Sequence, residues 1–324
     1  MINKTVFTFP SKDGIHTIHA ARWQKEGAPF VAVLQIVHGM AEHIDRYDEF
    51  AEFLAQKNIL VVGDDHLGHG RSAKEYGDYG YFCEKKAADI LIEDEHTLRK
   101  LVQDECPDVP YYILGHSMGS LILRNYITRY ADGLKGVVIC GTADNGRAIS
   151  FVGRMLSGAF RLFGKSREKS AFIDKIVFGS YNKLTDRHTE FDWLNTDERS
   201  VENYMKDPEC GFLFTVNGFD TLFTLAYRLK KRTLLKKIPK ELPVFLIAGL
   251  EDPVGKYGKG VENVYREYQR MGMQDVELKL YEHARHEILL EPGRKQIYAD
   301  ITEWLNRHLY TGLKARRKCN EKIV

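Results

Sequence analysis

The segment of this sequence with the clearest chemical meaning is Gly-His-Ser-Met-Gly at residues 115–119, in which a serine lies two residues from a glycine on either side. The short apolar run Tyr111–Leu114 precedes it, and the helical pattern Leu121–Tyr130 follows it. A sharp strand-to-helix turn requires small flanking residues and exposes the serine hydroxyl beside a helix N-terminus, where negative charge is favoured. The pattern therefore predicts that Ser117 is a nucleophile.

A serine hydroxyl is a weak nucleophile at neutral pH, so it requires a histidine base and an acid that orients the base. In an open α/β sheet the expected chain order is serine, acid, histidine. The strand-like run Val276–Tyr281 is followed by two candidates, His283 and His286. We predict His286 as the base, although spacing alone favours it only slightly over His283.

The orienting acid is expected after the strand-like run Val244–Ala248, where the turn carries Glu251 and Asp252. We predict Asp252, because a carboxylate directly before Asp-Pro more often faces solvent. Asp144, which follows another strand-like run, is a second candidate. The aspartates at 64–65 precede the serine in the chain and are expected to fix a turn instead.

Acyl transfer also requires hydrogen-bond donors for the oxyanion that develops on the substrate. The backbone N–H of Met118, the residue after the nucleophile, is one expected donor. The loop that follows the run Val31–Val37 supplies the other, and we predict the N–H of Met40, because Gly39 allows the backbone to approach closely.

The elements that must position these residues alternate along the chain. Helical spacing of apolar residues appears over 46–57, 86–102 and 261–271, with a stop at Gly272, and a last helix is expected over about 292–309. Strand, helix and strand in repetition favour a mostly parallel sheet covered on both faces. An antiparallel hairpin is expected first, from Lys4–Phe9 and His16–Trp23 across the Asp13-Gly14 turn. The expected sheet strands are Val31–Val37, Ile59–Val62, Tyr111–Leu114, Val137–Cys140, Val244–Ala248 and Val276–Tyr281.

One long segment, from about Asn145 to Leu235, breaks this alternation and contains no convincing strand. Aromatic residues are denser between 151 and 230 than in the whole chain, where they make up 11%. We interpret the segment as a helical subdomain on the loops of the sheet. Most of its aromatic residues are expected in its own core, and the others would line an apolar cavity.

Composition excludes several classes of protein. The 324 residues include 47 Lys and Arg against 45 Asp and Glu, a net charge of +2. This charge is too small to give the strong positive electrostatic potential that attracts nucleic acid. The 5 Cys are scattered without a CxxC pair, so neither a disulfide framework nor a zinc ribbon is expected. No apolar run is long enough for a secretory signal or a membrane span, and we expect a cytoplasmic protein. The predicted chemistry requires no metal or organic cofactor.

A short basic cluster, Lys-Ala-Arg-Arg-Lys at 314–318, lies near the end of the chain. A solvated terminus is its simpler interpretation. A transient contact with an anionic membrane surface is the alternative.

Taken together, these motifs resemble the serine α/β-hydrolase superfamily, and more closely its monoacylglycerol lipase/lysophospholipase-like branch. The matching segments run through the chain in the family's order: HGMAEHIDRY (38–47), DDHLGHGRS (64–72), GHSMGS (115–120), EDPVG (251–255) and ARHEILLE (284–291). The resemblance implies an α/β-hydrolase fold with an inserted helical cap. It divides the chain into a core at 1–141, a cap at 142–236 and the rest of the core at 237–324.

The same resemblance implies roles for individual residues. It makes Ser117, Asp252 and His286 the triad and Met40 and Met118 the oxyanion donors. Glu42, His43 and Arg46 would order the loop and line the polar end of the site near the leaving alcohol. Ser120 is a departure, since many relatives have Gly there, and no effect on the chemistry is expected.

The expected function is hydrolysis of monoacylglycerol, lysophospholipid or similar lipid-like monoesters, small-molecule acyl esters, through an acyl-enzyme. An aminopeptidase-like peptidase or a thioesterase would use the same triad on another bond. A peptidase would place carboxylates of the inserted segment near the pocket to hold the substrate amine, and Glu190, Asp192 and Asp197 are the candidates. A binding protein with a dead site is a third interpretation, which the intact motifs disfavour.

Overall fold

The computed structural model describes the chain apart from residues 75, 145–146, 163, 186–187 and 321–324. The side chains of the basic cluster at 314–318 also lie outside the described residues. None of the helices in the described part of the chain combines the length and apolar character that crossing a membrane requires.

An eight-stranded sheet forms the centre of the molecule, with the strand order β1-β2-β4-β3-β5-β6-β7-β8. The strands from β3 to β8 are mutually parallel, whereas β2 pairs antiparallel with both β1 and β4. This arrangement confirms the mostly parallel sheet and the antiparallel entry hairpin. The strands are β1 Ile2–Pro10, β2 Thr17–Lys25, β3 Ala32–Val37, β4 Ile59–Asp64, β5 Tyr111–His116, β6 Leu134–Cys140, β7 Val244–Gly249 and β8 Val276–Tyr281.

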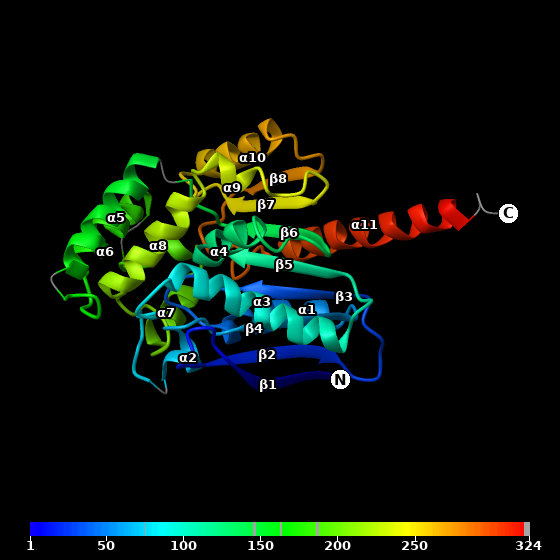
Figure 1. The fold of residues 1–324 in the computed structure, drawn as a ribbon, viewed down its shortest axis with the longest axis horizontal. Helices are drawn as coiled ribbons and strands as arrows, with labels where there is room; N and C mark the ends of the chain where they lie inside the picture. The colour runs from blue at the N-terminus through cyan, green and yellow to red at the C-terminus, as the bar shows by residue number, and fades with distance from the viewer. Residues whose placement is uncertain (75, 145–146, 163, 186–187, 321–324) are drawn as a thin grey trace.

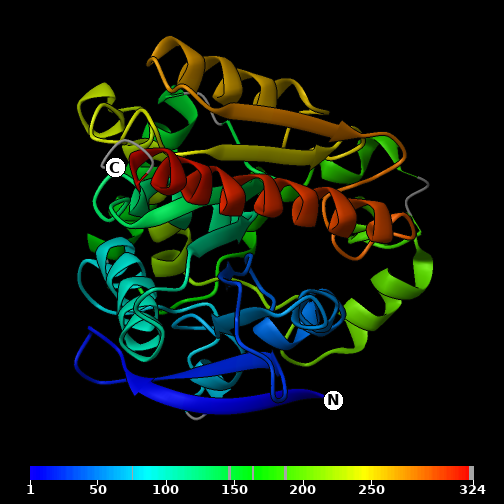
Figure 2. The ribbon, with the colours of Figure 1, turned by 90° about the vertical axis from the view of Figure 1, so that its right-hand side faces the viewer.

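Helices cover both faces of the sheet, as Figure 2 shows, and each face has its own hydrophobic cluster. On one face α1 (Asp48–Ala55) and α11 (Arg294–Asn320) pack against the sheet. The opposite face is covered by α3 (Ala87–Glu105), α4 (Met118–Tyr126) and α10 (Lys259–Arg270). Central strands are fully buried because helices lie on both sides, which explains their uninterrupted apolar runs.

Several helix limits differ from the sequence-based expectation. The helix after the predicted nucleophile begins at Met118, three residues earlier than its apolar pattern, and ends at Tyr126. The last helix continues to Asn320 rather than to about Leu309. The expected helix over 46–57 is preceded by a 3₁₀ turn, Ile44–Tyr47. The predicted stop at Gly272 is confirmed, and this residue adopts a φ of +80°, which glycine tolerates without strain.

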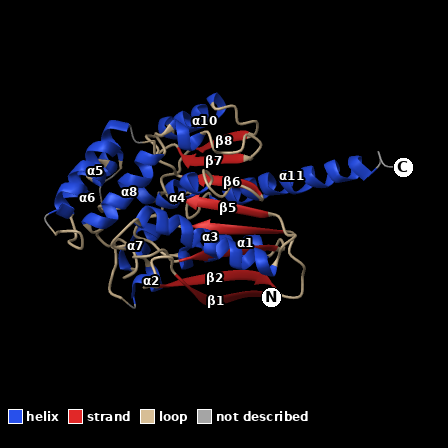
Figure 3. Ribbon diagram, in the orientation of Figure 1, coloured by secondary structure: helices blue, strands red, loops and turns tan. Residues whose placement is uncertain are grey.

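The segment between β6 and β7, which we call the β6–β7 insertion, contributes no strand to the sheet in its described part. It lies beyond the carboxyl ends of the parallel strands (Figures 1 and 3). Those ends are where open α/β sheets collect their ligand-binding loops. Its helices are α5 Arg147–Leu162, α6 Ala171–Phe178, α7 Glu198–Lys206, α8 Val216–Arg228 and α9 Arg232–Leu235, with 3₁₀ turns at Tyr181–Leu184 and Asp192–Leu194. The exact division at 142 and 236 stays a prediction.

Candidate active site

Ser117 lies at the turn between β5 and α4 with a positive φ of 53° and a ψ of −117°. This strained conformation for a non-glycine residue persists because the surrounding backbone is very closely packed. A side chain at Gly119 would place Cβ 2.0 Å from the Val37 carbonyl oxygen, and one at Gly115 would place it 2.5 Å from the Gly119 carbonyl oxygen. The Ser117 N–H donates a hydrogen bond to the Cys140 carbonyl at 3.0 Å, which joins the turn to β6.

The loops after β7 and β8 bring an acid and a histidine to this turn. His286 Nε2 lies 2.8 Å from Ser117 Oγ, and His286 Nδ1 lies 3.0 Å from Asp252 Oδ2. Both the histidine and the aspartate are buried, and the other aspartate oxygen accepts the Val254 N–H at 2.8 Å. Ser117, His286 and Asp252 thus form one hydrogen-bonded chain. This is the geometry in which a serine is activated by a base and the base is oriented by an acid.

The other candidates for the acid and the base do not contact the serine and have other surroundings. The His283 side chain is 91% exposed and lies 3.6 Å from Glu251, which is itself half-exposed. Asp144 forms an ion pair with Lys230 and a hydrogen bond with Asn263. Asp65 accepts the backbone N–H groups of Ile44 and Arg71 and so fixes a turn as expected, whereas Asp64 accepts no hydrogen bond from a described residue and does not.

The loop after β3 brings the predicted oxyanion donors to the same cavity. Met40 and Met118 both line it beside Ser117. Neither residue's backbone N–H donates to another group in the part of the chain that the structure describes. The adjoining residue, Ala41, adopts a φ of 52°, and its carbonyl accepts hydrogen bonds from Tyr204 Oη and the Gly211 N–H, both at 3.0 Å. The β6–β7 insertion therefore holds this loop in place.

Glu42 organises the buried side of the loop. One of its oxygens accepts the Gly39 N–H at 2.5 Å and the Tyr47 hydroxyl at 2.9 Å, and lies 3.1 Å from His116 Nδ1. Burial would raise the pKa of this carboxyl, but the His116 hydrogen bond and the charge of Arg46 outweigh it and lower the pKa well below its usual value. Glu42 therefore stays ionised and orders the loop, and it also lines the cavity.

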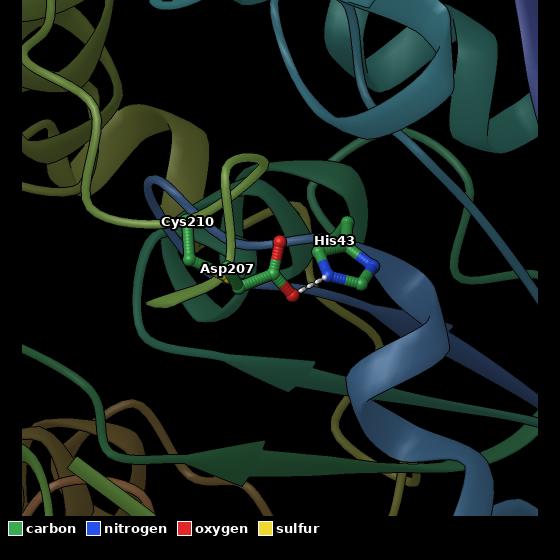
Figure 4. Close-up of side chains that lie close together, drawn as sticks. All are labelled: His43, Asp207 and Cys210. Carbon is green, nitrogen blue, oxygen red and sulfur yellow. Dashed lines mark hydrogen bonds and ion pairs between the residues drawn. The ribbon is translucent and has the colours of Figure 1, made fainter. Parts of the chain in front are cut away.

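Neither Arg46 nor His43 is among the described residues that line the cavity. Both side chains bind other polar groups instead. Arg46 pairs bidentately with Glu287, at 2.6 and 2.9 Å, and with Glu42 at 2.8 Å. His43 Nε2 lies 2.8 Å from Asp207 Oδ2, with Cys210 close by (Figure 4). Of the residues expected near the leaving alcohol, only Glu42 is placed at the cavity wall, and the other two join the loop to neighbouring segments.

His116, Glu287 and Arg285 belong to this network but were not among the predicted site residues. His116 Nε2 donates to the His286 carbonyl at 3.2 Å, and the Glu42 bond to the other nitrogen raises the pKa of His116 despite its burial. Arg285 donates to the carbonyls of two residues of the β6–β7 insertion. Each of the three is adjacent in the sequence to a predicted catalytic residue, and this adjacency is the only feature of the sequence that points to them.

The hydroxyl of Ser117 opens into a cavity of about 510 Å³ between the sheet and the β6–β7 insertion. Its walls are mainly apolar, and the Trp193 ring lies 5.2 Å from the His286 ring. Two carboxylates, Asp174 and Glu190, also line it. The aromatic residues of the insertion that line it are Phe178, Tyr181, Phe191, Trp193, Tyr204 and Phe212.

Two of the three carboxylates proposed for an amine site have structural partners instead. Asp192 accepts the backbone N–H groups of His188 and Thr189, and Asp197 caps the N-terminus of α7. Neither residue lines the cavity within the described chain, whereas Glu190 does.

The family model for "Serine aminopeptidase, S33" matches residues 28–293, which include the serine turn and the loops carrying the acid and the histidine. The chain belongs to this family. It is a serine hydrolase of the α/β-hydrolase fold, in the branch that contains the monoglyceride lipases.

Curated relatives and solved structures agree with this assignment. The monoglyceride lipase of Mus musculus is 39% identical over 292 residues, covering 89% of this chain and 86% of the relative. The monoacylglycerol lipase of Mycolicibacterium smegmatis is 26% identical over 306 residues, covering 93% and 97%. The crystal structure of a thermostable carboxyl esterase from Bacillus coagulans superposes with a TM-score of 0.88 at 30% identity, covering 94% of this chain and 99% of that one.

Proposed function

We propose that this member of the family hydrolyses monoacylglycerols, lysophospholipids or similar lipid-like monoesters through an acyl-enzyme. The observation that carries the proposal is the Ser117–His286–Asp252 hydrogen-bonded chain at the wall of an aromatic cavity of about 510 Å³. Such a cavity suits an aliphatic chain, because ligand sites are mainly apolar with a few placed polar groups. Two relatives named as monoglyceride or monoacylglycerol lipases support the same substrate class.

In the proposed mechanism, His286 takes the proton of Ser117 as its oxygen attacks the ester carbonyl. The oxyanion is stabilised by the N–H groups of Met40 and Met118. His286 then protonates the leaving alcohol, and water repeats the sequence on the acyl-enzyme. Asp252 keeps the imidazole oriented and stabilises its charged form.

A surface of the β6–β7 insertion supports brief contact with lipid aggregates. Phe151, Val152 and Met155 on α5 and Phe172 and Ile176 on α6 are about half or more exposed. Exposed apolar surface on a soluble protein often marks a site of contact with a membrane or a partner. We therefore propose that this surface, rather than the basic tail alone, meets the membrane when substrate is taken up.

A peptidase is the second candidate, because Asp174 and Glu190 face the cavity and could bind a substrate amine. Burial, and then the charge of Glu190, raises the pKa of Asp174, which a cationic partner would reverse. Aminoacyl p-nitroanilides distinguish the two functions. A peptidase would cleave them and would lose that activity in Glu190→Gln, whereas an esterase would not cleave them.

The decisive experiment measures hydrolysis of p-nitrophenyl esters from acetate to palmitate, followed by 1-monoacylglycerol. We expect wild type to prefer a particular chain length, Ser117→Ala to be inactive with an unchanged circular dichroism spectrum, and the exposed control Ser180→Ala to match wild type. Wild-type protein that cleaves no ester would contradict the proposal.

A further inference from the structure

Three ionisable side chains form a second, completely buried group next to the loop that follows β3 and carries Gly39 and Met40, the proposed oxyanion loop. Asp64 ends β4, His66 lies in the turn that follows, and Glu95 projects from α3. Each is at most 2% exposed. Neither oxygen of Asp64 accepts a hydrogen bond from any residue that the structure describes, and the same holds for Glu95 Oε1. Leaving buried carboxylate oxygens without a hydrogen-bond donor is costly, so positive charge beside them is favoured, and a bound cation would supply it.

The distances between the potential ligand atoms are compatible with a metal ion bound between them. His66 Nδ1 lies 3.2 Å from Glu95 Oε1 and 3.7 Å from Asp64 Oδ2, and all three ligand atoms lie within 4.8 Å of one another. Ligands of tetrahedral zinc with bonds of about 2.0–2.2 Å are separated by about 3.3–3.6 Å. The observed separations lie on either side of that range. The separation of 3.7 Å is too long for a hydrogen bond, whereas 3.2 Å is within hydrogen-bond distance.

The surrounding hydrogen bonds orient two of the three ligands, His66 and Glu95, toward the centre of the group. His66 Nε2 donates to the His38 carbonyl at 3.1 Å, so Nδ1 is the ring nitrogen that faces Asp64 and Glu95 and is available as a metal ligand. Gln35 Nε2 donates to Glu95 Oε2 at 2.5 Å, so that Oε1 faces the centre, and the Tyr111 hydroxyl fixes the Gln35 amide at 2.7 Å. Metal-binding histidines and carboxylates characteristically have such outer partners.

We propose that Asp64, His66 and Glu95 bind a structural zinc-type divalent cation. One imidazole and two carboxylates are a donor set that Zn²⁺ accepts. His66 contacts the carbonyl of His38, the residue immediately before Gly39 and Met40, so the cation stabilises the base of the oxyanion loop. Because the ligands are inaccessible in the folded chain, the ion is incorporated during folding and resists chelators afterwards.

Two other groups in the described chain place three possible metal-ligand atoms within 4.8 Å of one another, but their geometry differs. His43 lies 2.8 Å from Asp207, as Figure 4 shows, and His308 lies 3.0 Å from Asp275. Both separations are ordinary hydrogen bonds, and both groups are partly exposed. They therefore supply matched controls for the buried group.

The test uses the full chain expressed in zinc-supplemented medium and dialysed against EDTA, with bound metals measured by inductively coupled plasma mass spectrometry. We expect stoichiometric zinc in wild type and its loss in Asp64→Asn and Glu95→Gln. The controls Asp207→Asn and Asp275→Asn should retain it. Metal-free wild-type protein, or undiminished zinc in Asp64→Asn, would overturn the proposal.

A second measurement does not depend on the variants folding. Crystals of wild-type protein, measured on both sides of the zinc absorption edge, should show an anomalous peak between Asp64, His66 and Glu95. A zinc peak elsewhere, or an ordered water at that point with no anomalous signal, would mean that the group shares a proton or a water instead and that the proposal is wrong.

Discussion

Asp252 illustrates how much depends on one carboxylate. It contacts His286 Nδ1 at 3.0 Å and is fully buried, so it determines which ring nitrogen faces Ser117. Replacement by Asn preserves the shape but offers an amide that favours the wrong tautomer. We expect Asp252→Asn to lower kcat for p-nitrophenyl esters about 10³–10⁴-fold with little change in KM.

The neighbouring candidates provide the controls for this prediction. The side chains of Glu251 and His283 are 47% and 91% exposed and lie beside each other rather than beside the serine. Glu251→Gln and His283→Gln should therefore retain wild-type kcat and KM. A large loss in either variant, with Asp252→Asn active, would mean that the acid or the base is wrongly assigned.

At the scale of elements, the turn between β5 and α4 depends on close backbone contact. A Cβ at Gly119 would lie 2.0 Å from the Val37 carbonyl and 2.4 Å from the His38 carbonyl, so β3 or α4 would have to move. We expect Gly119→Ala to lower the free energy of unfolding by about 3 kcal/mol in urea titrations. Gly158→Ala, in α5, meets nothing within 4 Å and should increase stability by up to about 1 kcal/mol. Equal stability of Gly119→Ala and wild type would contradict this close packing.

The loop after β3, which carries the predicted oxyanion donor Met40, is a second element held by a few contacts. The Tyr204 hydroxyl donates to the carbonyl of Ala41, whose backbone is in the left-handed region. Tyr204→Phe keeps the ring over the Arg46 guanidinium but removes this bond. We expect a loss of about 1 kcal/mol in stability and up to about a fivefold loss in kcat/KM.

Tyr227→Phe is the matched control for that variant, since the Tyr227 hydroxyl has no hydrogen-bond partner among the described residues. The comparison uses urea unfolding and initial rates on one ester. If both variants lose activity equally, the Tyr204 hydroxyl is not what holds the loop.

At the scale of the whole molecule, the loop that carries His286 is joined to the β6–β7 insertion. The Arg285 guanidinium donates to the carbonyls of Asp192 and Asn195, at 2.7 and 2.9 Å, and the Glu287 N–H donates to the Leu194 carbonyl at 2.8 Å. These bonds place the segment that includes Trp193 against the histidine ring. The proposed acyl cavity and the proposed base are therefore held by the same contacts.

Arg285→Gln tests this connection. We expect a stability loss of about 1.5–3 kcal/mol, since the hydrogen bonds involve a charged donor. KM should rise more for long-chain p-nitrophenyl esters than for the acetate, because the wall contributed by the insertion moves while the serine turn remains. Equal changes in KM across the ester series would show that the acyl cavity does not depend on the hydrogen bonds between Arg285 and the β6–β7 insertion.

The sequence alone was sufficient for the local features of this protein. The Gly-His-Ser-Met-Gly turn, the strand runs and the order serine, acid, histidine depend on side-chain volume, hydrophobic period and chain order, which are local properties. The mostly parallel sheet and its entry hairpin followed from the same patterns. Helix ends were less predictable, as α4 and α11 show, because the last turns of a helix depend on packing that the apolar spacing does not encode.

Tertiary structure decided what depends on contacts between distant segments. His286 differs from His283 by burial, which follows from how the loop meets the β6–β7 insertion rather than from its distance to β8. Arg46 pairs with Glu287, which lies 241 residues later in the chain, and this pairing keeps Arg46 away from the cavity wall. The buried group of Asp64, His66 and Glu95 likewise forms only when α3 packs against β4. Such contacts join residues far apart in sequence, and only the folded chain brings them within bonding distance.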